Sequence, residues 1–218
     1  ANGMLITNKG LIAAYAEGGV ATATGILIDG GMVPVITTIG PPPAPAPMAV
    51  ATIENHGDIW AGISTDGGKT ILRGNAINTQ DAPNAVTILL ENNDPANIFG
   101  NIDISADDQI KVQNGVTKFD GVINPDMVLE GGLLVGSKGK LVMLNDNDVE
   151  GPSKAYVDVF EMGKKGTLQF NLTPDNSAGA YPTITANSAS LGGTFKAHYA
   201  DALYANKMVY ENVISADS

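Results

Sequence analysis

The chain is divided into short segments by glycine, proline and asparagine, and this punctuation restricts its fold more than any other feature. Its 218 residues include 26 glycines and 12 prolines, spread along the whole length. Between these breaks lie short runs of alternating apolar and polar residues, for example at 86–90, 110–112 and 168–172. Such alternation is typical of β-strands, and no capped window has the spacing of an amphipathic helix. The sequence therefore predicts an all-β chain.

A loose internal repeat indicates that the strands stack in coils. The sequence ITNKGLI at 6–12 recurs as IENHGDI at 53–59. This separation would suit about two coils of a parallel β-helix, each a little over roughly 20 residues long. Stacking would place isoleucine over isoleucine and asparagine over asparagine, because no coil can bury its apolar face alone. Glycine and asparagine suit the corners of such coils, since both tolerate left-handed backbone angles.

An antiparallel β-sandwich is the alternative fold. The sequence QNGV at 113–116 lies between two short strand patterns and has the composition of a two-residue hairpin. A hairpin there would reverse the chain and make its flanking strands antiparallel neighbours.

Composition limits both the core and the partners. Hydrophobic residues make up 44% and aromatic residues only 6%, so the core must be built from aliphatic side chains. The net charge of −11 argues against nucleic acid or an anionic membrane as a partner. A single arginine, Arg73, makes clamps for phosphate or carboxylate groups improbable in a binding site. The chain has no cysteine, which excludes disulfides and thiolate sites.

The chain shows no signal for a membrane helix or a leader. It contains no apolar run of the length that spans a bilayer as a helix. It opens at Ala1 without methionine or a basic segment, so we expect a fragment of a longer gene product. The proline-rich stretch at 41–47 is expected to be a stiff loop excursion between coils.

An acidic cluster is the weak candidate for a metal site. Asp146, Asp148 and Glu150 alternate and are followed by Gly151, as at the front of a calcium-binding loop. The twelfth position counted from Asp146 is Val157, so the closing carboxylate is missing. We expect a solvated turn that binds Ca²⁺ weakly at best, and no cofactor.

No catalytic constellation stands out. His56 and His198 are far apart in the sequence, and His198 lies on the exposed face of a strand pattern. Asp107 and Asp108 are adjacent, so in a strand they would point to opposite faces. These observations favour a binding or structural protein over an enzyme.

Four segments near the C-terminus resemble a known family. They are LLVGSKG at 133–139, GKLVML at 139–144, GTLQFNLTP at 166–174 and ASLGGTFKAHY at 189–199, followed by KMVYENVIS at 207–215. In this order they resemble the end of the passenger domain of classical Gram-negative autotransporters. The resemblance covers about residues 85–218, and Phe195 stands where leucine is usual.

The resemblance implies a right-handed parallel β-helix displayed at the cell surface. Residues 1–130 would be coils of a secreted passenger, forming a structural stalk or adhesive module. Residues 131–218 would be the autochaperone cap, which nucleates folding during outer-membrane secretion. The implied partners are the passenger's own outer-membrane β-barrel and a host-surface or glycan ligand, with the chain itself a monomer.

The cap should contain a self-sufficient folding core. We expect its apolar residues to lie inside and its paired glycines to form a tight corner that a Cβ would crowd. These residues are Leu168, Phe170, Leu172, Ile184, Leu191, Gly192, Gly193 and Phe195. The alternative function is a β-helical carbohydrate-active enzyme, a polysaccharide lyase or hydrolase, although one arginine suits a lyase poorly.

Overall fold

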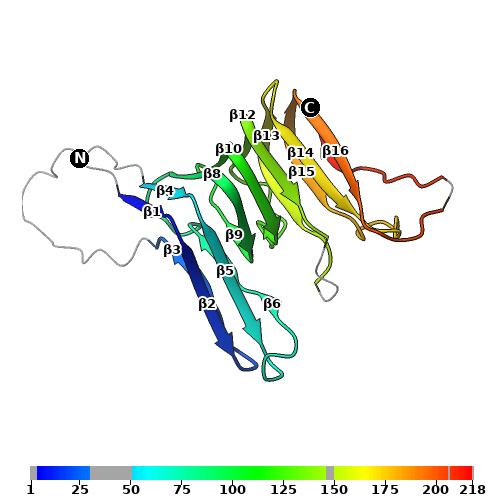
Figure 1. The fold of residues 1–218 in the computed structure, drawn as a ribbon. Helices are drawn as coiled ribbons and strands as arrows, with labels where there is room; N and C mark the ends of the chain where they lie inside the picture. The colour runs from blue at the N-terminus through cyan, green and yellow to red at the C-terminus, as the bar shows by residue number, and fades with distance from the viewer. Residues whose placement is uncertain (1–3, 30–50, 146–149, 206, 218) are drawn as a thin grey trace, which may run out of the picture.

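The computed structural model consists of β-strands joined by turns. It describes residues 4–29, 51–145, 150–205 and 207–217, and these residues include no helix. All strands belong to one 17-stranded sheet, and nearly all pairings in it are parallel. The sheet is curled, and successive stretches of the chain lie side by side from its N-terminal to its C-terminal end (Figure 1). The all-β prediction is confirmed, and the arrangement is compatible with a parallel β-helix.

The strands form three ladders, in each of which every strand pairs in parallel with the next; each strand of a ladder is called a rung here. The first ladder contains β1 (Leu5–Asn8), β4 (Ala51–Asn55), the first parts of β8 (Val86–Phe99), β10 (Gln109–Asp120) and β12 (Gly132–Met143), and the second parts of β13 (Lys154–Met162) and β15 (Thr183–Leu191).

The second ladder runs beside the first, because three strands bend and contribute to both. It contains β2 (Leu11–Glu17), β5 (Asp58–Ser64), the second parts of β8, β10 and β12, β14 (Thr167–Leu172) and β16 (Thr194–Tyr199).

The third ladder completes the curled sheet. It contains β3 (Thr24–Leu27), β7 (Asn75–Asn78), β9 (Asn101–Asp103), β11 (Val122–Ile123), the first parts of β13 and β15, and β17 (Ile214–Ala216). The short strand β6 (Leu72–Arg73) pairs with β5 and is antiparallel to it.

The internal repeat forms neighbouring rungs. Ile6 pairs with Ile53, and Asn8 pairs with Asn55, as the stacking argument predicted. The Nδ2 atom of Asn8 donates to Oδ1 of Asn55 at 2.8 Å, and both side chains are buried. The interpretation of the spacing as two coils was wrong, because the two copies are adjacent rungs. The described strands between the two copies, β2 and β3, belong to the second and third ladders.

The hairpin predicted at 113–116 does not form. Strand β10 continues from Gln109 to Asp120, and both of its parts pair in parallel with β12 and β8. Gly115 has a φ of 73° and lies where the strand passes from the first ladder to the second. The Asn-Gly pair therefore forms a bend between ladders instead of a reversal.

The core lies inside the curl of the sheet. Alternate residues of each strand point into it, so that Ile53, Ile88 and Ile110 stack along the first ladder and Ile59 and Ile98 along the second. These five side chains are almost completely buried. The aliphatic core that the composition required is therefore built as continuous columns across rungs.

Asparagine also satisfies backbone groups at a corner. Asn124 has a φ of 54° and is buried. Its Oδ1 accepts from the N–H of Ile104 at 3.0 Å, and its Nδ2 donates to the carbonyls of Glu130 and Tyr156 at 3.1 and 2.8 Å. One side chain thus joins three successive rungs, which no apolar residue could do.

The glycine corner of the predicted cap is as tight as expected. Gly193 has a φ of 73°, and a Cβ there would lie 2.3 Å from the carbonyl oxygen of Gly166. At Gly192, a Cβ would lie 3.0 Å from the carbonyl oxygen of Met162. The close approach of successive turns therefore requires glycine at 193 and favours it at 192.

The predicted folding core is buried in part. Leu168, Phe170, Leu172 and Ile184 are buried, as expected. The prediction was wrong for Leu191 and Phe195, which are 50% and 46% exposed. Both point toward the core side of the sheet, but they belong to the last rungs of their ladders, and no described rung follows to cover them.

Tyrosines fasten the segment between β16 and β17 to earlier rungs. Tyr204 donates its hydroxyl to the carbonyl of Leu172 at 2.9 Å, and Tyr210 donates to that of Thr173 at 2.5 Å. Tyr181 donates in the opposite sense, to the carbonyl of Glu211 at 2.6 Å. These bonds fix the path of the chain back to β17.

The ladders continue across residue 131, where we placed the boundary between coils and cap. The pairing of β10 with β12 joins the two sides over most of their length. The proline-rich stretch at 41–47 lies outside the described residues.

Candidate functional site

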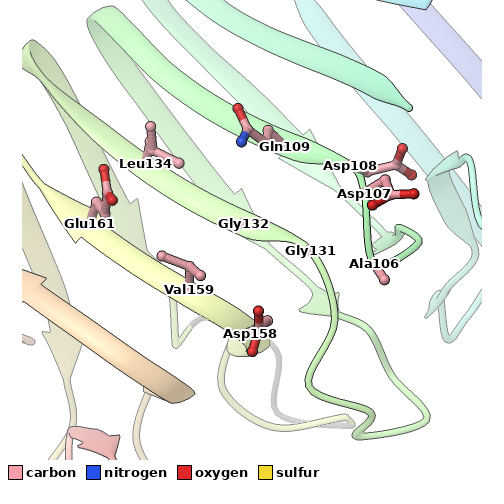
Figure 2. A pocket seen from close by; sticks show the side chains of 10 residues that line it. All are labelled: Ala106, Asp107, Asp108, Gln109, Gly131, Gly132, Leu134, Asp158, Val159 and Glu161. Atoms are coloured by element: carbon pink, nitrogen blue, oxygen red, sulfur yellow. The ribbon is translucent and has the colours of Figure 1, made fainter. Parts of the chain in front are cut away.

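An acidic hollow lies on the outside of the first ladder. It has a volume of about 350 Å³ and lies among the turn before β10, the start of β12 and the second part of β13. Asp107 and Asp108 line it from the turn, and Asp158 and Glu161 line it from β13 (Figure 2). Gly131 and Gly132 lie between these two acidic groups.

Asp108 accepts hydrogen bonds from three other residues at the edge of this hollow. It is buried, and its Oδ1 accepts from the backbone N–H of Val86 at 2.6 Å. Its Oδ2 accepts from the hydroxyl of Thr79 at 2.8 Å and from the N–H of Ser105 at 2.9 Å. Both oxygens are thus occupied by donors of the chain, which stabilise a carboxylate in a buried place.

The other acids of the hollow face solvent. Asp107 is exposed while Asp108 is buried, but the two lie in the turn before β10 and both line the hollow, so the strand alternation expected for them does not apply. Asp158 is exposed and its Oδ1 accepts from Nδ2 of Asn187 at 2.8 Å. No group of three or more acidic or histidine side chains among the described residues is placed to hold a metal ion. The hollow therefore presents negative charge without a built chemical centre.

The predicted metal ligands are only partly described. Asp146 and Asp148 lie outside the described residues, so the calcium hypothesis stays a prediction for them. Glu150 is described, and its Oε2 accepts from the backbone N–H of Arg73 at 2.6 Å. It also lies 4.0 Å from Nε of Arg73. Glu150 thus contacts a segment far from its own turn.

Arg73 is used inside the fold. It is buried, and its guanidinium pairs with the carboxylate of Asp120 through Nη2 and through Nε at 3.1 Å. Its Nη2 also donates to the carbonyl of Gly151 at 2.8 Å. Arg73 therefore joins β6 to the end of β10 and to the turn before β13. The sequence showed that the arginine is single but not that it is buried.

The histidines occupy unrelated places. His198 lies on β16 and is exposed, as predicted for a strand histidine. His56 is partly buried, and its Nδ1 lies 2.6 Å from the carbonyl oxygen of Glu91. The structure does not bring the two histidines together: His56 lies between β4 and β5, and His198 in the last rung of the second ladder.

Two ionisable groups show the local electrostatics. Burial, and then the carboxylate of Asp126, raise the pKa of Asp103 above its ordinary value of 3.8. Burial, and then the ammonium groups of Lys196 and Lys118, lower the pKa of Lys140. Lysines thus gather on the second ladder, although the chain as a whole is acidic.

An aromatic column on the outer face of the second ladder was missed from the sequence. The rings of Tyr15 and Trp60 stack at a centroid distance of 6.3 Å, and those of Trp60 and Phe99 stack at 5.5 Å. The three rings come from β2, β5 and β8. Only pairing of the three strands could have revealed the column, because the residues are far apart in the chain.

A second hollow lies beside these rings. It has a volume of about 470 Å³, and Leu11, Ala13, Trp60 and Phe99 form most of its lining. Asp58 and Asn97 supply polar groups at its side. This combination of an aromatic wall and fixed polar groups is what small polar ligands with an apolar face require.

Comparisons with models of protein families, with curated proteins and with solved structures gave no match. None of the described residues forms a helix long and apolar enough to cross a membrane.

Proposed function

We propose that the chain is part of the secreted passenger of an autotransporter, with an adhesive or stalk role at the bacterial surface. In this proposal its strands form a right-handed parallel β-helix, and residues 131–218 are the autochaperone cap. The protein has no catalytic role of its own and acts as a monomer. Its partners are the outer-membrane barrel of the same protein and a surface ligand.

One observation carries the proposal: three of the segments that resemble the family are stacked in register as neighbouring rungs of the second ladder. The sequence GKLVML at 139–144 lies under GTLQFNL at 166–172, with Leu141 paired to Leu168. That segment in turn lies under GTFKAHY at 193–199, with Leu168 paired to Phe195. A likeness that was only a chance run of short motifs would not be expected to follow a single ladder in register.

Burial supports the proposed role of residues 131–218 as a folding nucleus. Leu168, Phe170 and Ile184 are buried among the last rungs, and the tyrosine hydroxyl bonds fasten the segment that follows β16. In a stack of rungs, stability is the sum of the rungs' own stability and the contacts between neighbours. A well-packed group of rungs at one end can therefore serve as the nucleus on which the others fold.

The folding role is tested by hydrogen exchange on the intact chain in mild denaturant. We expect amides of β12 and β14 to exchange last, and those of β2 and β3 first. Stronger protection in the N-terminal rungs than in β12 and β14 would reverse the direction of dependence and contradict the autochaperone assignment.

The secretion role needs a separate test in cells. The chain is placed between a signal peptide and the barrel of a characterised autotransporter, and surface display is measured by accessibility to added protease. We expect the complete chain to be displayed in a protease-resistant form. Without 131–218, the remainder should be degraded. Equal resistance of both would count against a cap at this end.

A further inference from the structure

The hollow beside the aromatic column has the features of a ligand site, and none of its rings is needed for the core. Along β5, Ile59 and Ala61 point inward and are fully buried, whereas Trp60 points outward and is only partly buried. The only tryptophan of the chain is therefore on the outer face. Because aromatic residues are scarce here, three of them in one outward column require an explanation beyond packing.

The indole of Trp60 is held in place before any ligand arrives. A Cβ at Gly62 would lie 2.3 Å from Cη2 of Trp60 and 2.6 Å from its Cζ2. Glycine at 62 thus gives the indole room to lie against the strand. Phe99, directly opposite in register, stacks on Trp60 with an interplanar angle of 15°. A fixed ring loses little conformational entropy on binding, which favours affinity.

Polar groups beside the rings are fixed as well. The backbone N–H and the Nδ2 of Asn97 both donate to Oδ1 of Asp58, at 2.7 and 3.1 Å. Both bonds end on one oxygen, so the carboxylate is oriented, and both residues line the hollow. A carboxylate accepts hydrogen bonds, and a side-chain amide both donates and accepts, which matches neighbouring hydroxyl groups of a sugar.

The chemistry selects a neutral sugar over charged ligands. The face of an aromatic ring carries partial negative charge and attracts the C–H groups on the apolar face of a pyranose. Asp58 and the net charge of −11 repel uronates and other acidic sugars. A quaternary ammonium ion is favoured by rings that surround it, whereas these rings form one stacked column with interplanar angles of 15° and 24°.

We propose that this hollow binds a neutral sugar residue of a glycan, with the pyranose against Trp60 and Phe99 and its hydroxyls on Asp58 and Asn97. The proposal deepens the adhesive part of the proposed function and names its ligand class. It does not depend on the route of secretion, so the display experiment and the binding experiment can fail separately.

The test uses the full chain and a panel of neutral oligosaccharides, namely gluco-, galacto-, manno- and xylo-oligosaccharides at millimolar concentration. Fluorescence of the single tryptophan, together with ligand-observed NMR, reports binding. We expect saturable binding of at least one of them and none of oligogalacturonate or tetramethylammonium. Trp60→Ala should weaken binding about ten-fold or more, and Trp60→Phe should retain most of it.

Two further variants separate binding from folding. Leu11→Glu changes an exposed residue of the lining and should weaken binding without altering the unfolding transition. Phe195→Ala removes an exposed aromatic ring elsewhere and should leave binding unchanged. The proposal is overturned if no neutral oligosaccharide binds, if Trp60→Ala and Leu11→Glu both bind normally, or if tetramethylammonium binds more tightly than every sugar.

Discussion

Leu168 and Phe195 are register partners on neighbouring rungs, yet Leu168 is completely buried and Phe195 is nearly half exposed. The two side chains point to the same side of the second ladder. Leu168 is covered by rungs on both sides, whereas Phe195 has a described rung on one side only. Position along the ladder, and not residue type, thus decides what each side chain contributes to stability.

Truncation of these two partners should therefore have unequal effects. Leu168→Ala should cost about 2–5 kcal/mol of unfolding free energy, because it leaves a cavity between two rungs. Phe195→Ala should cost well under the roughly 3–5 kcal/mol of a buried phenylalanine. Denaturant unfolding followed by circular dichroism measures both. A larger loss for Phe195→Ala would show that a further segment covers it in solution.

Alanine substitutions at three glycines distinguish the cost of a positive φ from the cost of a steric clash. Gly193→Ala should destabilise by about 1–3 kcal/mol or more, because both its φ and the carbonyl of Gly166 oppose a Cβ. Gly179→Ala should show the conformational cost alone, since its φ is 89° and no atom lies within 4 Å. Gly10→Ala, with neither constraint, should be nearly neutral. Thermal unfolding ranks the three, and an equal loss at all three would refute this explanation.

The buried arginine should be costly to remove. Arg73→Met leaves the carboxylate of Asp120 without its partner, and loss of one member of a buried pair costs about 3–5 kcal/mol. Lys69→Met, in the same region but exposed, is the matched control and should stay within about 0.5 kcal/mol. In a double-mutant cycle with Asp120→Ala, the double variant should lose less than the two single variants together. Strict additivity would mean that the pair contributes nothing.

Asp103 should make the fold less stable as pH rises. Its pKa is raised in the folded state, so the unfolded chain releases this proton first. Stability is therefore lost as pH increases from 3.8 through the higher folded pKa. Asp103→Asn should be more stable than the parent at pH 7 and equal to it below about pH 3.8. Urea unfolding at several pH values measures this difference.

Asp66→Asn is the control for that experiment, because its expected effect on stability at neutral pH has the opposite sign. The pKa of Asp66 is lowered, chiefly by hydrogen bonds from Thr70. Its contribution is present above the ordinary pKa and is lost as pH falls through the lower folded value. Asp66→Asn should thus lose stability at neutral pH. A gain at neutral pH for Asp66→Asn, or a loss for Asp103→Asn, would contradict these assignments.

The strands and the inward or outward direction of their side chains could be predicted from the sequence, but the burial of each side chain could not. Alternation placed Ile53 and Leu168 on the core side correctly, because a period of two is a local property. The same alternation placed Phe195 inside, since it carries no information on whether another rung follows. Arg73 was recognised as the single arginine, and Trp60 was not singled out at all. Their partners Asp120 and Phe99 become neighbours only through strand pairing.

Asn8 and Asn55 form one step of a ladder although 47 residues separate them, whereas less than half as many separate Thr87 from Gln109 in a comparable step. The position of a residue in this molecule is thus set by its ladder and its rung. The length of chain that connects two rungs differs from one step to the next. Lengthening a flexible connection costs only about 0.6 kcal/mol per doubling. A connection between two rungs is therefore a natural insertion point for a foreign peptide, and the pairing of Asn8 with Asn55 would report whether the scaffold has stayed in register.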